Sequence, residues 1–249
     1  VRDRSQLDRL VAPLDMQNSR GMDYLAYKFD IVLRGRRQTM FENKPEGMYV
    51  MTQPLDILVE TPSQTAGPYV HIGCIPTFAG VEGVYPEDLG LSPIEDGAKG
   101  ELITIVGSIY DGTGWAMRDA MLESWQADAA GVYHGQDGAD PKVSGFCRFA
   151  ADKDTGEYTL RTIKPGTVKG RNGLVFAPHV SIWIVARGIN IGLNTRIYFD
   201  DEDNSADPLL ARIEQRPRVD TLIAKKTGDG SYRFDIRLQG EGETVFLDL

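Results

Sequence analysis

The side chains in this sequence that could bind a metal or act in acid–base catalysis are few and scattered. The candidates are three histidines, two cysteines and a tyrosine next to a histidine: His71, His134, His179, Cys74, Cys147 and Tyr133. No two histidines have the spacing of a local metal site such as His-x-His, so a site requires residues brought together by the fold. A structural or surface role is the alternative for each histidine and for the Tyr133–His134 pair.

Loops typical of a known catalytic chemistry do not occur. The sequence has no Gly-x-Ser-x-Gly elbow, no Walker-type phosphate loop, and no Gly-x-Gly-x-x-Gly after a strand. The acidic run at residues 199–207 lacks the spacing of an EF-hand, so we predict a solvated turn there and not a calcium site. Spacing alone therefore predicts no complete catalytic constellation.

Composition narrows the class of protein. The chain has 249 residues, of which 41% are hydrophobic and 25% charged, which is ordinary for a globular domain with a sizeable core. The net charge of −9 argues against nucleic acid as a partner, and no apolar run is long enough to span a membrane. Two cysteines do not make a disulfide framework and suit a reducing compartment, so we expect a cytoplasmic protein.

The charge also divides the chain near residue 50. Residues 1–50 hold nine Lys or Arg and seven Asp or Glu, a balance of +2, whereas residues 51–249 hold 18 and 29, a balance of −11. Met51 opens a stretch that reads like the start of a protein, and Val1 does not. We therefore predict a segment at 1–50 joined to a domain at 51–249.

Most of the remaining chain carries strand signals. Short β-branched or aromatic runs that end in turn residues predict strands within the ranges 100–114, 157–166, 179–188, 195–202 and 232–238. Many short strands favour a sandwich or barrel. Residues 117–131 have helical propensity but can also alternate as a strand. Residues 205–215 predict a helix capped by Ser205.

The segment at residues 60–73 is predicted to be neither helix nor strand, because prolines and a glycine interrupt it. Its apolar residues Tyr69, Val70 and Ile72 are expected to be buried. Such a segment wraps over a surface or lines a pocket, and an ordinary connecting loop is the alternative.

One strand-like phrase occurs near both ends of the chain. YKFDIVLRG begins at Tyr27 and YRFDIRLQG begins at Tyr232, and six of their nine positions are identical. In the second phrase Tyr232, Phe234, Ile236 and Leu238 alternate with polar residues, which predicts one buried face. One unusual domain with an internal repeat is one interpretation of this pair.

Longer phrases carry a resemblance to a known family. They are TPSQTAGPYVHIG from Thr61, DAMLESWQADAAGVYHG from Asp119, RTIKPG from Arg161 with the run at 177–199, and YRFDIRLQGEGETVFLDL at the end. Together they resemble the intradiol ring-cleavage dioxygenases, and within them the α subunit of members that cleave protocatechuate with two homologous subunits, α and β. The resemblance covers residues 51–249.

The same family accounts for the repeated phrase. Residues 25–48 resemble the C-terminal tail of the β subunit, so the chain resembles a β tail joined to a whole α subunit. The Val1 start favours a boundary inside such a fusion. The fold implied by the resemblance is all-β, a sandwich of two mixed sheets with short helical excursions, and it favours a strand at residues 117–127 over the local helical propensity.

The resemblance also implies where the metal is bound. In the family Fe(III) is held by two tyrosines and two histidines, and Tyr133 and His179 match one ligand of each kind. Val168 and Ser181 stand where the second tyrosine and the second histidine are found, and Phe176 replaces an arginine of the same motif. The resemblance thus implies a vestigial site without metal in this chain, and Fe(III) in a partner β subunit.

A different set of residues is implied to border the partner's pocket. The loop with Thr65, Gly67 and Pro68, together with Arg187, matches segments of α that lie beside the iron of β. Gly67 and Pro68 would form a wall poor in side chains, and Arg187 would hold the substrate carboxylate. Arg196 is a weaker candidate for the same role.

The implied function is the α-type subunit of a hetero-oligomeric dioxygenase. The whole enzyme would cleave protocatechuate with O2 to 3-carboxy-cis,cis-muconate, and this chain alone would be inactive because two of four iron ligands are missing. The alternative is a non-catalytic β-sandwich that binds a small aromatic acid at the vestigial site.

Overall fold

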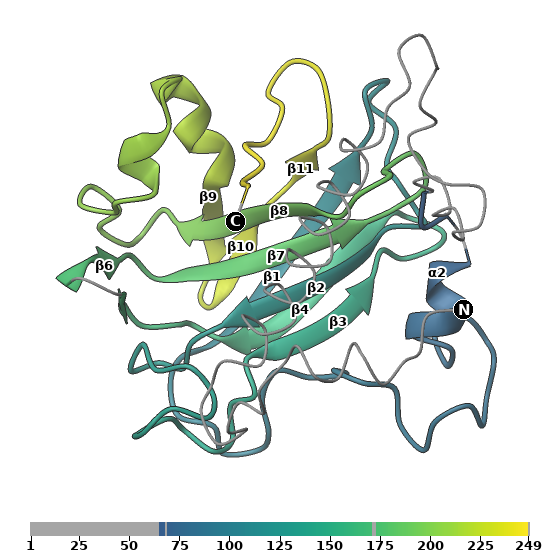
Figure 1. Ribbon diagram of the computed structural model, residues 1–249, viewed down its shortest axis with the longest axis horizontal. Helices are drawn as coiled ribbons and strands as arrows, with labels where there is room; N and C mark the ends of the chain where they lie inside the picture. The colour runs from purple at the N-terminus through teal and green to yellow at the C-terminus, as the bar shows by residue number, and fades with distance from the viewer. Residues whose placement is uncertain (1–64, 68, 171–172, 249) are drawn as a thin grey trace, which may run out of the picture. The chain divides into compact units, whose positions relative to one another are not determined.

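The computed structural model describes residues 65–67, 69–170 and 173–248, and strands dominate this part of the chain (Figure 1). The elements in chain order are α2 (Val70–Cys74), β1 (Leu102–Tyr110), β2 (Met121–Gln126), β3 (Phe146–Ala150), β4 (Glu157–Ile163), β5 (Val168–Lys169), β6 (Val175–Phe176), β7 (His179–Val185), β8 (Leu193–Phe199), the 3-10 helices η4 (Leu210–Arg212) and η5 (Arg216–Leu222), β9 (Ile223–Gly228), β10 (Ser231–Arg233) and β11 (Ile236–Arg237). The strand predicted at 117–127 from the resemblance is confirmed as β2, against its helical propensity.

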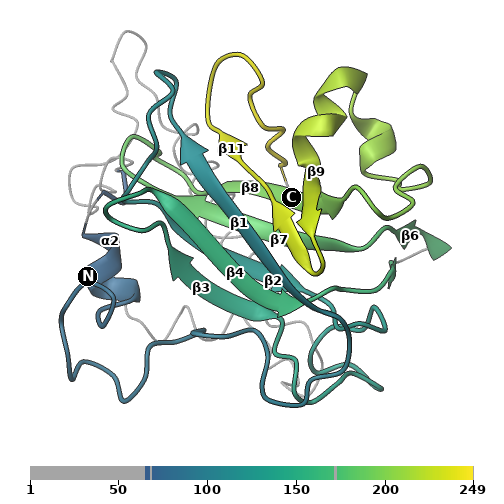
Figure 2. The same cartoon turned by 180° about the vertical axis from the view of Figure 1, so that it is seen from behind.

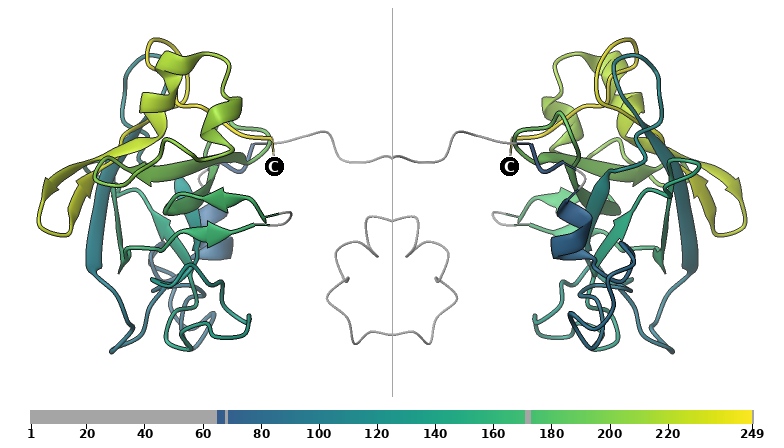
Figure 3. Two further views of the ribbon diagram at one scale, coloured as in Figure 1. Left: turned by 90° about the vertical axis from the view of Figure 1, so that its left-hand side faces the viewer. Right: turned by 90° about the vertical axis from the view of Figure 1, so that its right-hand side faces the viewer.

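The strands form one mixed sheet that folds back on itself. Its order is β11-β1-β10-β9-β8-β7-β2-β3, with β4 on the other edge of β1, and β5 and β6 form a separate pair. Strand β9 runs antiparallel to β10 and parallel to β8, so it joins the two halves. One half, β8-β7-β2-β3, faces the viewer in Figure 1, the half with β1, β4 and β10 faces the viewer in Figure 2, and Figure 3 shows the layers from their edges. The predicted all-β fold with mixed pairing is confirmed.

The core lies between these halves and follows the pleat of the strands. In β7 the even-numbered residues Val180, Ile182 and Ile184 are buried in the same cluster as Ile103 and Ile105 of β1. Each such side chain stabilises the fold by roughly 1.5–3 kcal/mol when it is fully buried. Because side chains alternate along a strand, the odd-numbered residues of β7 point to the opposite face.

The C-terminal phrase forms two short strands and not the single strand that was predicted. The alternation itself is confirmed, since Tyr232, Phe234 and Ile236 are buried and Asp235 is exposed. The break lies at Phe234 and Asp235, where Phe234 passes Gly107 of β1 so closely that a Cβ on Gly107 would lie 1.7 Å from the Phe234 carbonyl oxygen. The close approach of two backbones therefore requires glycine at this point.

The helix predicted at residues 205–215 is wrong. Only the short 3-10 turn η4 forms there, followed by η5. Ser205 does not cap it; the buried carboxylate of Asp207 accepts the N–H groups of Leu209 and Leu210 at 2.8 and 3.0 Å. Asp207 also accepts hydrogen bonds from Ala177 N and the Tyr198 hydroxyl, which fix the position of this turn, so tertiary structure overrides local propensity.

The prediction for residues 60–73 is wrong in two respects. Val70–Cys74 forms a single helical turn, α2, which directs His71 inward. Tyr69 and Ile72 were expected to be buried but are 78% and 47% exposed. No helix in the described ranges is long and apolar enough to cross a membrane.

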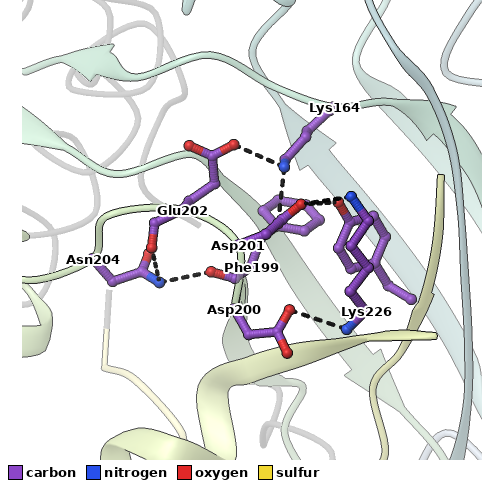
Figure 4. A network of polar contacts seen from close by, with 8 residues as sticks. Lys164, Phe199, Asp200, Asp201, Glu202, Asn204 and Lys226 are labelled. Carbon is purple, nitrogen blue, oxygen red and sulfur yellow. Dashed lines mark hydrogen bonds and ion pairs between the residues drawn. The ribbon is translucent and has the colours of Figure 1, made fainter. Parts of the chain in front are cut away.

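The acidic run is a largely exposed turn, as predicted, and it also carries a network of ion pairs (Figure 4). Lys164 Nζ lies 2.9 Å from Asp201 Oδ1 and 2.7 Å from Glu202 Oε1. Lys226 Nζ and the Tyr232 hydroxyl both lie 3.0 Å from Asp201 Oδ2. Burial raises the pKa of Asp201, but hydrogen bonds from both lysines and from Tyr232 outweigh it and lower this pKa to about 2.

This network predicts a pH-dependent contribution to stability. Because the pKa of Asp201 is lower in the folded than in the unfolded chain, its contribution is present above about pH 4 and is lost as the pH falls toward 2. We expect Asp201→Asn to lower the free energy of unfolding by about 1–2 kcal/mol at pH 7, allowing for the partial exposure of the pair. Urea denaturation at several pH values measures this loss.

The matched control is Asp137→Asn, at an exposed carboxylate for which the described part of the chain offers no ion pair. It should leave the free energy of unfolding nearly unchanged. Equal losses from both changes, or a loss at Asp201 that does not depend on pH, would contradict the assigned role of the network.

Candidate functional site

The face of β7 turned away from the core carries the predicted site residues. His179, Ser181, Trp183 and Val185 lie on it in order. Across the strand pairs, Ser181 is opposite Arg196 of β8 and Trp125 of β2. Two clusters of functional candidates lie on this face, one at each end of the strand.

At the start of β7 the imidazole of His179 is fixed by the backbone. Its Nδ1 lies 2.7 Å from the carbonyl oxygen of Ala177, which only accepts, so Nδ1 carries the proton. Nε2 therefore presents a lone pair, and it is buried with no hydrogen-bond partner among the described residues. Burial, reinforced by the positive charge of Arg196, lowers the pKa of His179 to about 4.

Tyr133 reaches this cluster from a tight turn after β2. The buried carboxylate of Asp128 accepts two backbone N–H groups of the turn, each at 2.9 Å. Gly131 has φ +78°, and a Cβ there would lie 1.8 Å from the carbonyl oxygen of Thr167, so the turn requires glycine. The Tyr133 ring stacks on Trp125, with centroids 5.9 Å apart and planes 7° apart.

The phenol of Tyr133 is held in its neutral form. Burial raises its pKa, and the charge of Arg196 opposes the rise without cancelling it. Tyr133 stacks on Trp125, and Trp125 and Arg196 flank Ser181 in the neighbouring strands. The structure therefore places Tyr133 and His179 at the same end of this face.

Arg196 is the side chain at the centre of this cluster. Its guanidinium carbon lies 5.4 Å from the centre of the Phe176 ring, a cation–π geometry. The His179 ring lies 5.7 Å from the ring of Tyr198 and 6.2 Å from that of Phe176. Atoms Nε and Nη1 of Arg196 are buried, and within the described ranges they have no hydrogen-bond partner.

These donors do not fit a ferric ion. Burial raises the pKa of Tyr133, which disfavours a tyrosinate ligand. Val168 is buried and has a hydrocarbon side chain without a donor atom, and the positive charge of Arg196 repels a metal ion. Among the described residues no three His, Cys, Asp or Glu side chains gather as a metal site. We therefore derive no chemistry at a metal in this chain.

A second cluster lies at the other end of β7. The Thr65 hydroxyl donates to the carbonyl of Ala186 at 3.0 Å, which holds its loop beside Arg187. Gly67 is buried, with φ +61°. The Arg187 side chain is 69% exposed, and its Nε lies 3.3 Å from Asp119 Oδ2. Thr65, Gly67 and Arg187 are thus together, and Pro68 lies outside the described residues.

The two clusters are well separated. Six residue steps from His179 to Val185 span about 20 Å along an extended strand. Figure 1 shows β6 beyond the start of β7 and α2 beyond its end. Thr65, Gly67 and Arg187 are therefore too far from Tyr133 and His179 to act on the same small molecule.

The other sequence candidates have structural surroundings. His134 is exposed, with Nδ1 3.1 Å from the carbonyl oxygen of Val143, and His71 packs against Phe78 at 5.6 Å. Burial raises the pKa of the Cys147 thiol to about 12, so it is no nucleophile.

Two buried carboxylates that organise the site were missed by sequence reasoning. Asp128 carries a local signal, since it precedes a turn with glycine three residues later. Asp207 carries none, because its partners Ala177 and Tyr198 come from distant segments, at 2.9 and 3.2 Å.

Residues 76–240 match the family model described as Dioxygenase. The chain is 49% identical over 200 residues to the protocatechuate 3,4-dioxygenase alpha chain of Pseudomonas putida, covering 78% of this chain and 99% of that one. It is 37% identical to the alpha chain of Burkholderia cepacia, covering 77% and 98%. Identity to the beta chain of Burkholderia cepacia is 31%, covering 65% and 75%.

The environment of His179 predicts a second pH effect. Its pKa is lower in the folded chain, about 4, than in the unfolded chain, about 6.5. Between these values only the unfolded chain takes up the proton, so the free energy of unfolding falls by about 3 kcal/mol as the pH drops from 6.5 to 4. His179→Gln should remove this part of the pH dependence.

NMR titration of the His179 ring measures its pKa in the folded chain, and urea denaturation at each pH measures the free energy of unfolding. His134→Gln, at an exposed histidine, serves as the control and should leave the slope unchanged. A midpoint for His179 near 6.5 would show that the imidazole is not held neutral by the fold.

Proposed function

The chain belongs to the intradiol dioxygenase family, a family of oxidoreductases, and from this premise we propose that it acts as the α-type subunit of a protocatechuate 3,4-dioxygenase. Its match to an alpha chain extends over 99% of that relative at 49% identity, against 31% identity to a beta chain. In this role the chain completes the substrate pocket of an iron-bearing β subunit.

The observation that carries the proposal is the separation of the two clusters on β7. Arg187, with most of its guanidinium exposed, cannot serve the Tyr133–His179 end of the same chain. An exposed arginine beside a short, anchored loop is instead suited to a ligand held mainly by a neighbouring subunit. A planar guanidinium matches the carboxylate of protocatechuate, and Gly67 offers a wall without a side chain to a flat ring.

This assignment gives each subunit a separate role. Fe(III) in the β subunit supplies the activation of the bound catechol for reaction with O2, which gives 3-carboxy-cis,cis-muconate. Thr65 fixes the loop through its hydrogen bond to Ala186, and Arg187 orients the substrate through its carboxylate. The enzyme is then a cytoplasmic hetero-oligomer of α and β subunits that requires neither nucleic acid nor membrane.

The N-terminal part of the chain enters the proposal through the resemblance alone. Residues 1–50 form a segment like the β-subunit tail, and residues 51–249 form the α-like domain. The alpha-chain match leaves 22% of this chain outside it, which supports an additional segment of about that length.

The first prediction concerns iron. The chain purified alone should contain no stoichiometric iron, should be colourless, and should not turn over protocatechuate, because its own donors do not fit Fe(III). Co-purification with an iron-bearing β subunit should give a coloured, active complex. Elemental analysis and visible absorbance test this, and tyrosinate absorbance with one iron per isolated chain would overturn the assignment.

The second prediction concerns Arg187 in the complex with β. Arg187→Ala should raise KM for protocatechuate roughly 10- to 100-fold, since loss of a charge-assisted hydrogen bond costs about 1.5–3 kcal/mol. The iron content should not change. Turnover of catechol, which has no carboxylate, should be nearly unaffected.

Arg161→Gln, at another exposed arginine, is the matched control and should change neither substrate. Equal losses on protocatechuate and catechol after Arg187→Ala would make Arg187 a packing or interface residue. The proposed contact with the carboxylate would then be wrong.

A further inference from the structure

We propose that Asp119 is a positioning residue, which sets the direction of the Arg187 guanidinium for the substrate carboxylate. This role rests on the proposed function, in which Arg187 binds the carboxylate, and adds to it the side chain that orients the arginine. Asp119 itself contacts neither the substrate nor the iron of the β subunit, so its whole effect passes through Arg187.

The pairing of β2 with β7 brings Asp119 and Arg187 opposite each other. Met121 is opposite Val185 at the end of the antiparallel ladder. Two residues beyond that pair, the same register places Asp119 opposite Arg187. The contact follows this register, since Arg187 Nε lies 3.3 Å from Asp119 Oδ2. A pair of opposite charges across neighbouring strands is favourable in itself.

The backbone that carries Arg187 is held in place by the residues around it. Ile189 N donates to the carbonyl oxygen of Ala186 at 3.2 Å, which closes a turn around Arg187. A Cβ on Gly192 would lie 1.9 Å from Trp183 Nε1, so the same loop packs directly on that indole. Because the backbone is fixed, the freedom that remains at Arg187 is the rotation of a long side chain that is 69% exposed.

Asp119 is the fixed partner of this ion pair. Its side chain is 18% exposed, and its Oδ1 is buried without a hydrogen-bond donor among the described residues. It directly precedes Ala120, which is fully buried and whose carbonyl oxygen accepts the N–H of Ala151 at 2.9 Å. A carboxylate anchored in this way restricts the exposed guanidinium, and its buried, unsatisfied oxygen is a cost that calls for an explanation.

The contact occupies only one edge of the guanidinium. Asp119 pairs with Nε, and within the described part of the chain Arg187 has no second ion pair. The terminal nitrogens Nη1 and Nη2 form the other donor edge, which can hold both oxygens of a carboxylate in parallel hydrogen bonds. Asp119 thus directs the arginine and leaves this fork free for the ligand.

A carboxylate beside Arg187 has two opposing effects on a bound anion. It reduces the freedom that Arg187 loses on binding, and it also repels the substrate carboxylate. Two substitutions separate geometry from charge. Asp119→Glu keeps the charge but moves the carboxylate by one methylene, whereas Asp119→Asn keeps the shape and an acceptor oxygen but removes the charge.

The experiment measures KM and kcat for protocatechuate and catechol with the full chain in complex with an iron-bearing β subunit. Asp119→Ala and Asp119→Glu should raise KM for protocatechuate about 3- to 10-fold, the effect of freeing one long side chain. Asp119→Asn should raise it less than Asp119→Glu. KM for catechol, kcat and iron content should change little, because catechol has no carboxylate.

A double substitution and a matched control test whether the effect passes through Arg187. In the Arg187→Ala background, Asp119→Glu should cause no further change, because the side chain that it orients is gone. Glu243→Ala removes a comparable ion pair, with Arg218 at 2.9 Å, and should leave both substrates unaffected. If Asp119→Ala does not assemble with β, the comparison of Asp119→Glu with Asp119→Asn decides.

Failure of this role and failure of the proposed function give different results. A loss specific to protocatechuate in Arg187→Ala, with none in Asp119→Glu, would refute the role of Asp119 and leave the proposed function intact. Equal losses on both substrates in Arg187→Ala would refute both. A lower KM in Asp119→Asn with no change in Asp119→Glu would reduce Asp119 to a repelling charge, and a further loss in the double variant would show that it acts independently of Arg187.

Discussion

The alternation of side chains along β7 is the constraint on which the rest of the structure depends. Its even-numbered residues Val180, Ile182 and Ile184 bury one face in the core, so the register of the strand is fixed. Its odd-numbered residues must then lie on the other face, where His179 begins one cluster and Val185 ends near the other. A shift of one residue would turn His179, Ser181 and Trp183 toward the core.

Each end of this face has an arginine, and the surroundings of the two arginines differ. Arg187 is mostly exposed and held by Asp119, in a form that a ligand from outside can use. Arg196 lies over the Phe176 ring, and its positive charge adds to burial in lowering the pKa of His179. The two ends of this face thus hold one arginine at the surface and another beside aromatic side chains.

Buried carboxylates give the irregular segments their shape. Asp128 closes the turn that presents Tyr133, and Asp207 fixes the turn before η4 while also binding the Tyr198 hydroxyl. Asp201 differs, because it is exposed and joins two lysine side chains at the end of β8. The two buried carboxylates accept backbone N–H groups that a regular element would otherwise satisfy, which is how long loops can pack against a sheet.

The sequence by itself determined the strand content, the alternation of the C-terminal phrase, and the family, because these depend on local periodicity and on long phrases. It also named Tyr133 and His179 together. Only the tertiary structure decided that Arg196 lies at their end of the face, that Arg187 lies about 20 Å away along the strand, and that residues 205–215 form no long helix. Periodicity says which face a residue lies on, but which buried polar groups meet depends on how distant strands pair.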